Sequence, residues 1–204
     1  MLLNFLQFPF PFLGGAIISG ILIDQRRESG KAPAYVTVMS SIFFLLLFVL
    51  IGGNLGWLGK FGEPFELIGD IVLVSALCLA CGLQNASVVS ATHGSIRTTH
   101  LTGILTDLGI NLVRLRKVKR FSKEKYRQVI INKIRFGTFA SFSMGSALSS
   151  LLFFRYEYFG FILPCLTSMA LLVVSYIAES RRKIQGEPSV KIIPSKLAGE
   201  LTQT

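Results

Sequence analysis

Residues 78–107 read CLACGLQNASVVSATHGSIRTTHLTGILTD, and this run of amides, hydroxyls, small residues and two histidines interrupts otherwise apolar sequence. The interior of a membrane tolerates such groups only where protein, water or a ligand satisfies their hydrogen bonds. Their concentration in one segment therefore predicts a functional site inside a membrane protein.

The sequence on either side has the composition of an integral membrane protein. Of the 204 residues, 51% are hydrophobic and 16% are charged, whereas roughly a quarter of the residues in a soluble domain are charged. Five stretches approach or exceed the roughly 20 apolar residues that a spanning helix needs; they are 5–23, 36–56, 67–91, 136–154 and 158–178. We therefore expect an all-α polytopic membrane protein, with a single transmembrane domain over 1–183 and a flexible cytoplasmic tail over 184–204.

Basic residues predict how these helices are oriented, because Lys and Arg in short loops stay on the cytoplasmic side of a membrane. Most of the 21 basic residues follow the first stretch (Arg26, Arg27, Lys31), lie between 114 and 135, or follow the last stretch. This asymmetry places the N-terminus outside and the C-terminus in the cytoplasm.

The same orientation constrains the polar segment. The stretch 67–91 returns to the cytoplasm, and the basic loop 114–135 is cytoplasmic too, so residues 92–113 cannot cross the membrane. Their apolar part, 101–113, would form a helix only about 20 Å long, which is too short to span. We therefore expect a re-entrant half-helix within 92–113, an arrangement that forms midplane binding sites in many secondary transporters.

The predicted substrate site combines amides at the end of one helix with the start of the half-helix. Gln84 and Asn85 could bind a solute or ion, or only hydrogen-bond to a neighbouring helix. Asp107 could be a proton- or cation-coupling carboxylate, or form a salt bridge to the basic loop. Thr98 and Thr99 could cap the half-helix, so that its free N–H groups face a polar or anionic solute. The substrate-binding residues that we predict are Gln84, Asn85, Thr98, Thr99, Thr102, Gly103 and Asp107.

Two stripes of small residues spaced four apart predict close helix packing. The first holds Gly15 with Ser19 and Ala16 with Gly20, and the second holds Gly137, Ser141, Gly145 and Ser149. The two helices would run in opposite directions and each precedes another span, so 5–56 and 136–178 predict the two halves of an inverted repeat. The polar segment precedes only the second half, which makes the repeat incomplete.

CGLQNAS at 81–87 and TTHLTGILTDL at 98–108 resemble the paired signature of the YoaK-like family, bacterial inner-membrane proteins with a domain of unknown function. The resemblance covers about residues 5–183. It implies a bacterial inner-membrane location, and it implies no substrate or catalytic residue. Family members usually begin with a further helix and a Gly-Asn half-helix that have no counterpart here; a misassigned start, a fragment or a naturally shortened protein would each account for this.

The remaining motifs predict structure rather than chemistry. Cys78 and Cys81 have a metal or redox spacing, but they lie mid-helix with no basic neighbour to activate a thiol. His93 and His100 lie seven residues apart without a nearby carboxylate pair. The sequence also lacks a phosphate-binding loop, a His-Glu-x-x-His motif and a Gly-x-Ser-x-Gly elbow. We therefore expect no metal, no cofactor and no enzymatic activity.

The basic segment RLRKVKRFSKEKYRQVIINKIRF at 114–136 would suggest nucleic acid in a soluble protein. Between membrane helices, attraction to anionic lipid headgroups explains it, so we expect no nucleic-acid partner. Ser122 is the predicted N-cap of a helix that lies on the membrane surface through Tyr126, Val129, Ile130 and Ile134.

Two functions fit this pattern. A secondary transporter or permease for a small polar or anionic solute requires that Gln84, Asn85, Thr102 and Asp107 face one cavity. A non-transporting membrane partner or sensor subunit is the alternative, and the incomplete repeat favours it. In either case the chain could form a homo-oligomer.

Overall fold

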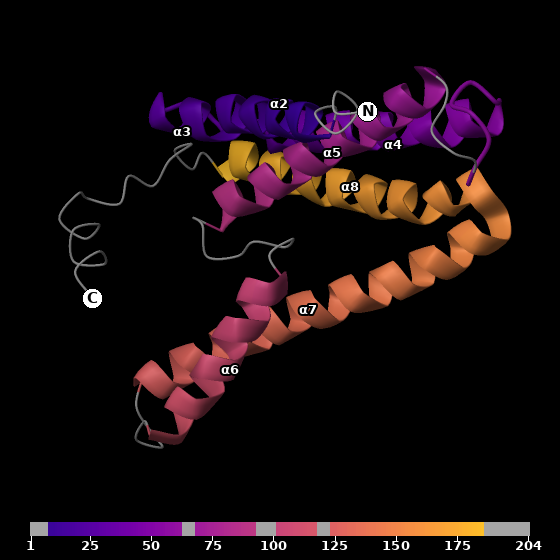
Figure 1. Ribbon diagram of the computed structural model, residues 1–204. Coiled ribbons are helices and arrows are strands. Elements are labelled where there is room, and N and C mark those ends of the chain that lie inside the picture. Colours follow the sequence, from indigo (N-terminus) through magenta and orange to yellow (C-terminus); the bar gives the residue numbers. More distant parts are fainter. Residues whose placement is uncertain (1–7, 63–67, 93–100, 118–122, 186–204) are drawn as a thin grey trace.

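A computed structural model describes residues 8–62, 68–92, 101–117 and 123–185, and every regular element among them is helical. The all-α prediction is confirmed for this part of the chain. The elements are α2 (Pro9–Gly20), the π-helical turn η1 (Ile21–Gln25), α3 (Arg26–Glu28), α4 (Tyr35–Asn54), α5 (Ile68–Ala91), α6 (Leu101–Lys117), α7 (Lys123–Tyr156), the 3-10 turn η2 (Glu157–Phe161) and α8 (Ile162–Gln185). Figure 1 shows α2, α4, α5 and α8 side by side, with α6 and most of α7 extending away from them.

Three helical stretches are long and apolar enough to cross a membrane, namely Tyr35–Asn54, Ile68–Ala91 and Gln128–Lys183. The third is 56 residues long and contains most of α7, with η2 and most of α8; the two helices form the sides of a V (Figure 1). The predicted first span, 5–23, is not among the three; its residues 5–7 lie outside the described part of the chain, and α2 ends after 12 residues at the π-helical turn. The chain thus has the helices of a polytopic membrane protein, and the count of five spans remains a prediction.

The helices α2 and α5 touch through glycines. A Cβ atom added to Gly15 would overlap the Leu79 carbonyl oxygen, and one added to Gly82 would overlap the Phe12 carbonyl oxygen. Ser19, one turn after Gly15, is fully buried. The backbones can approach this closely only because no side chain separates them, as the first stripe of small residues predicts.

Two buried clusters hold α4 against its neighbours. The cluster near the start of α4 comprises Ile23, Val38, Ile42 and Leu83. The cluster near its end comprises Val49, Leu58, Tyr158 and Phe161. The Tyr158 hydroxyl also donates a hydrogen bond to the Leu58 carbonyl oxygen, 3.0 Å away. This second cluster anchors η2, and with it the turn between α7 and α8, on the connection between α4 and α5.

The helix α6 packs along the N-terminal part of α7, and we call this pair, residues 101–117 and 123–156, the arm (Figure 1). Its second helix begins at Lys123, directly after the predicted cap Ser122, which itself lies outside the described residues. The predicted basic loop 114–135 is therefore helical wherever it is described. The first helix of the arm continues to Lys117, past the predicted end of the half-helix at 113.

The second stripe of small residues has different surroundings from the first. A Cβ atom added to Gly137 or Gly145 would meet nothing within 4 Å. The arm diverges from the other helices, so no helix backbone among the described residues packs on these glycines. The two halves of the predicted inverted repeat thus differ in their packing, and the repeat remains a prediction.

Candidate functional site

A cavity of about 470 Å³ lies between α4, α5, α7 and α8. Its apolar lining includes Met39, Ile42 and Leu46 of α4. Its polar lining comes from all four helices and comprises Tyr35, Gln84, Ser87, Ser149, Thr167, Ser168 and Ser175. Among the described residues, no charged side chain lines it. This volume and this mixture of apolar walls with a few polar groups are typical of a site for a small molecule.

Three of the lining hydroxyls act as hydrogen-bond donors to their own helices. Ser87 Oγ lies 2.8 Å from the Gln84 carbonyl oxygen, Thr167 Oγ1 3.0 Å from that of Pro164, and Ser168 Oγ 2.9 Å from that of Cys165. Because a carbonyl oxygen can only accept, each hydroxyl proton is used within the helix, and each hydroxyl oxygen keeps lone pairs. These three side chains therefore offer acceptors to the cavity.

Tyr35 presents the opposite polarity. The Arg27 guanidinium donates from Nη2 to the Tyr35 hydroxyl oxygen, 2.8 Å away. Since the guanidinium has only donors, the phenol accepts this bond and its own proton remains for another acceptor. Tyr35 thus offers a donor to the cavity. Because Tyr35 is the first residue of α4, this donor lies at the end of the cavity nearest the start of that helix.

A charged cluster lies behind Tyr35 and joins three helices. The Ser90 hydroxyl of α5 donates to Asp24 Oδ2, 2.5 Å away, while Arg27 Nη1 lies 3.4 Å from Asp24 Oδ1 and 3.2 Å from the Ser90 carbonyl oxygen. Asp24 belongs to the π-helical turn η1, and such turns occur frequently at functional sites. The cluster holds the Arg27 side chain in the position from which it orients Tyr35.

The sequence alone did not predict this cluster, because Arg27 appears there only as one of the basic residues that orient the membrane helices. An acid and a base three residues apart, directly after the first apolar stretch, are the signal that could have found it. Nothing local identifies Ser90 of α5 or Tyr35 of α4 as partners, since tertiary packing brings them to this pair.

The structure separates the predicted site residues. Gln84 lines the cavity, whereas Asn85 does not, and its Nδ2 lies 3.8 Å from Cys81 Sγ one turn earlier on α5. Thr102 and Gly103 are exposed on α6. Thr98 and Thr99 lie outside the described residues, as do His93 and His100.

Asp107 forms an ion pair within the arm. Its Oδ2 lies 2.8 Å from Arg135 Nη2 of α7. This geometry is the salt bridge to the basic segment that the sequence left open as an alternative to ion coupling. It attaches α6 to α7, so the structure does not bring Asp107 or Thr102 together with Gln84.

Residues 3–175 match the model of a protein family of unknown function, DUF1275. The resemblance to the YoaK-like family is consistent with this match. No curated protein and no solved structure matches the chain. Its activity therefore has to be inferred from the geometry of the cavity.

Proposed function

The chain belongs to the DUF1275 family of proteins of unknown function, and we propose that it is a membrane carrier for a small polar solute. The observation that supports this proposal is the cavity of about 470 Å³, with oriented hydroxyls, between helices apolar enough to cross a bilayer. Polar groups at membrane depth are costly unless they are satisfied, and lone pairs directed at a cavity are satisfied by a solute or water.

The direction of the hydrogen bonds narrows the class of solute. Ser87, Thr167 and Ser168 offer acceptors, Tyr35 offers a donor, and the Gln84 amide offers both. Acceptor oxygens attract N–H and O–H groups and repel anionic oxygens. Within the predicted polar or anionic class, the cavity therefore favours a neutral solute with several donors, such as a polyol or an amide.

The arm provides a route for access to the cavity. Gly145 and Ser149 of α7 form its wall on the arm, and the space beside Gly145 is unfilled. Rotation of α7 about η2 would bring this wall toward α4, α5 and α8, which is the hinge type of domain closure. We place this carrier in the bacterial inner membrane with five spans, a re-entrant segment before α7 and a cytoplasmic C-terminus.

A stabilisation screen tests the proposal. The purified chain should unfold at a higher temperature with polyols or amides, and should respond less to carboxylates at equal concentration. Gln84→Ala should raise the solute concentration at half effect about tenfold, because it loses a hydrogen bond made in a water-poor site. Asn85→Ala is the matched control, because its side chain does not line the cavity.

Two results would contradict the proposal that the chain is a carrier. The first is an equal loss of stabilisation in Gln84→Ala and Asn85→Ala, which would show that the solute does not occupy this cavity. The second is stabilisation by the solute without its uptake into liposomes that contain the protein.

The exposed apolar surface of the arm favours the second function, a non-transporting partner or sensor subunit. Met144, Leu151 and Phe154 of α7 are 65%, 68% and 94% exposed, and a partner helix could cover them in place of lipid. Tight association with another membrane protein, together with solute flux that Gln84→Ala and Asp107→Ala leave unchanged, would select this function.

A further inference from the structure

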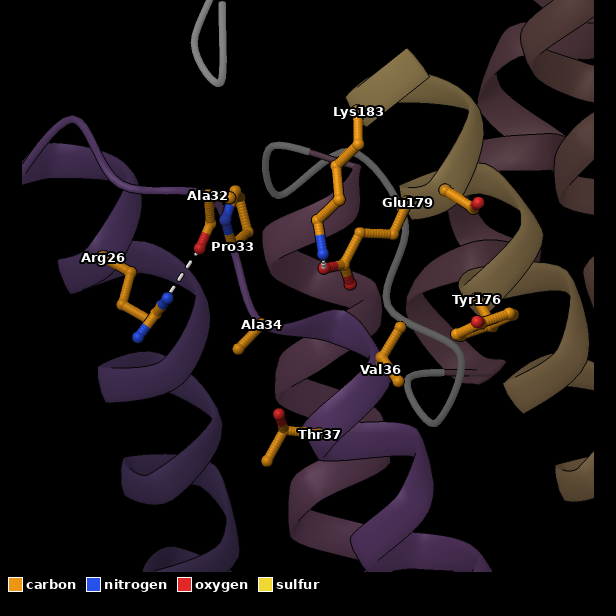
Figure 2. A pocket seen from close by; sticks show the side chains of 10 residues that line it. Arg26, Ala32, Pro33, Ala34, Val36, Thr37, Tyr176, Glu179 and Lys183 are labelled. Atoms are coloured by element: carbon orange, nitrogen blue, oxygen red, sulfur yellow. Dashed lines mark hydrogen bonds and ion pairs between the residues drawn. The ribbon is translucent and has the colours of Figure 1, made fainter.

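A second cavity, of about 350 Å³, lies at one end of the bundle formed by α2, α4, α5 and α8, where the chain turns from α3 into α4 (Figure 2). Its walls are the start of α3, the α3–α4 connection, the first turn of α4 and the last turns of α8. It is distinct from the solute cavity, which includes Tyr35 but none of these lining residues.

Charged side chains from two separate helices face this second cavity. Figure 2 shows Arg26 on one side and Lys183 with Glu179 on the other. Lys183 Nζ lies 2.9 Å from Glu179 Oε1. Arg26 and Lys183 are cations and Glu179 is an anion, so the lining of the cavity carries a net positive charge. The start of α4, which no side chain caps, adds the partial positive charge of its free N–H groups.

The Arg26 side chain is held in place with donors to spare. Its Nε donates to the Ala32 carbonyl oxygen, 3.0 Å away, and no hydrogen bond joins its Nη groups to a described residue. A guanidinium in this state presents a planar pair of donors that matches two oxygens of a phosphate. The cavity therefore has the chemistry of a phosphate site.

The level of the cavity along α8 indicates where that phosphate comes from. Val173 and Val174, which precede it, are exposed and apolar, whereas Arg182 and Lys183 lie in the last turn of the helix. Tyr176 lines the cavity between these two regions and is 64% exposed, as is usual for an aromatic side chain at a membrane interface. A phosphate at this level would belong to a lipid whose chains cover the apolar part of α8.

We propose that this cavity binds the phosphate of an anionic phospholipid through Arg26 and Lys183. The lipid phosphate accepts from the Arg26 Nη groups and from Lys183, while Glu179 keeps Lys183 directed at the cavity. The site depends neither on the solute cavity nor on the proposed transport, so it holds whether or not the carrier proposal is correct.

Lipid titration of the purified full chain in neutral detergent tests the site. Phosphatidylglycerol should raise the unfolding temperature, and the lipid concentration at half effect should rise about tenfold in Arg26→Gln and in Lys183→Gln, since each loses one charged hydrogen bond. Arg26→Lys keeps the charge without the planar fork and should fall between the wild type and Arg26→Gln. Arg182→Gln is the matched control, because it removes the same charge from the neighbouring residue, which does not line the cavity.

Each comparison can overturn the proposal. Stabilisation by inorganic phosphate at the same concentration would assign the cavity to a soluble anion. Equal stabilisation by phosphatidylcholine would show that the net charge of the lipid does not matter. An equal weakening in Arg182→Gln and Arg26→Gln would show that only the total charge of the protein attracts the lipid.

Discussion

Gln84 and Asn85 are adjacent amides on α5, yet only Gln84 lines the solute cavity. Successive residues of a helix point about 100° apart, so adjacent side chains rarely share a site. The sequence cannot say which of the two faces the cavity, because apolar residues surround both. The lining hydroxyls Ser149, Thr167 and Ser168 were missed for a related reason, since hydroxyls are common in apolar helices and only tertiary packing makes these ones converge.

Tyr35→Phe should destabilise the protein by about 1–3 kcal/mol, because it leaves a partly buried Arg27 donor without its acceptor. Equilibrium unfolding in mixed detergent micelles measures this change. Tyr156→Phe, on an exposed ring, is the control and should have little effect. If Arg27→Gln and Tyr35→Phe destabilise additively in the double variant, the two side chains do not interact as described.

At the scale of helices, the apolar runs predict α4 and α5 closely. The expected 36–56 and 67–91 became Tyr35–Asn54 and Ile68–Ala91, because length and hydrophobicity decide a long helix almost alone. The first stretch was less predictable, since the π-helical turn that places Asp24 beside Ser90 has no local signature. The salt bridge from Asp107 to the basic segment was one of two alternatives that the sequence left open, and periodicity does not show that Arg135 of α7 is its partner.

Gly82→Ala should destabilise the contact between α2 and α5 by about 1–3 kcal/mol, because the new methyl group meets the Phe12 backbone and the helices must separate. Gly137→Ala on α7 is the matched control. Its methyl group meets open space, so the better helix propensity of alanine should leave stability unchanged or raise it by up to about 1 kcal/mol. Thermal unfolding of both variants checks this, and equal losses would contradict the glycine contact.

The pair between Asp107 and Arg135 should contribute less than about 1 kcal/mol, because the Asp107 side chain is 55% exposed. A double-mutant cycle with Asp107→Asn and Arg135→Gln measures the coupling. Amide hydrogen exchange in α6 should quicken in Asp107→Asn and stay unchanged in α4, since α6 packs on α7 rather than on the bundle. Faster exchange in both helices would mean that the pair supports the whole fold.

At the scale of the molecule, the solute cavity is shared between two parts that differ in packing. Three of its walls belong to α4, α5 and α8, which contact one another directly or through η1 and η2, while the fourth wall is the arm. Near η2 the ring of Phe153 of α7 also stacks on Phe61 of the α4–α5 connection. The rest of this wall can move at little energetic cost, because few buried contacts with α4, α5 and α8 are lost. The hinge of this movement would be η2, whose position is fixed by the hydrogen bond from the Tyr158 hydroxyl to the Leu58 carbonyl oxygen.

The distance between α7 and α8 should therefore shorten when a solute fills the cavity. Spin labels at Leu148 and Met169, both about half exposed and both outside the cavity lining, report this distance after Cys78, Cys81 and Cys165 are replaced by alanine. The solute should narrow the distance distribution and move it to shorter values, because it bridges Ser149 of α7 and Ser168 of α8. Gly145→Trp fills the wall beside the cavity and should abolish the shift while α8 stays helical. An unchanged distribution with bound solute would show that the arm is a fixed wall, and access to the cavity would then have to arise within α4, α5 and α8.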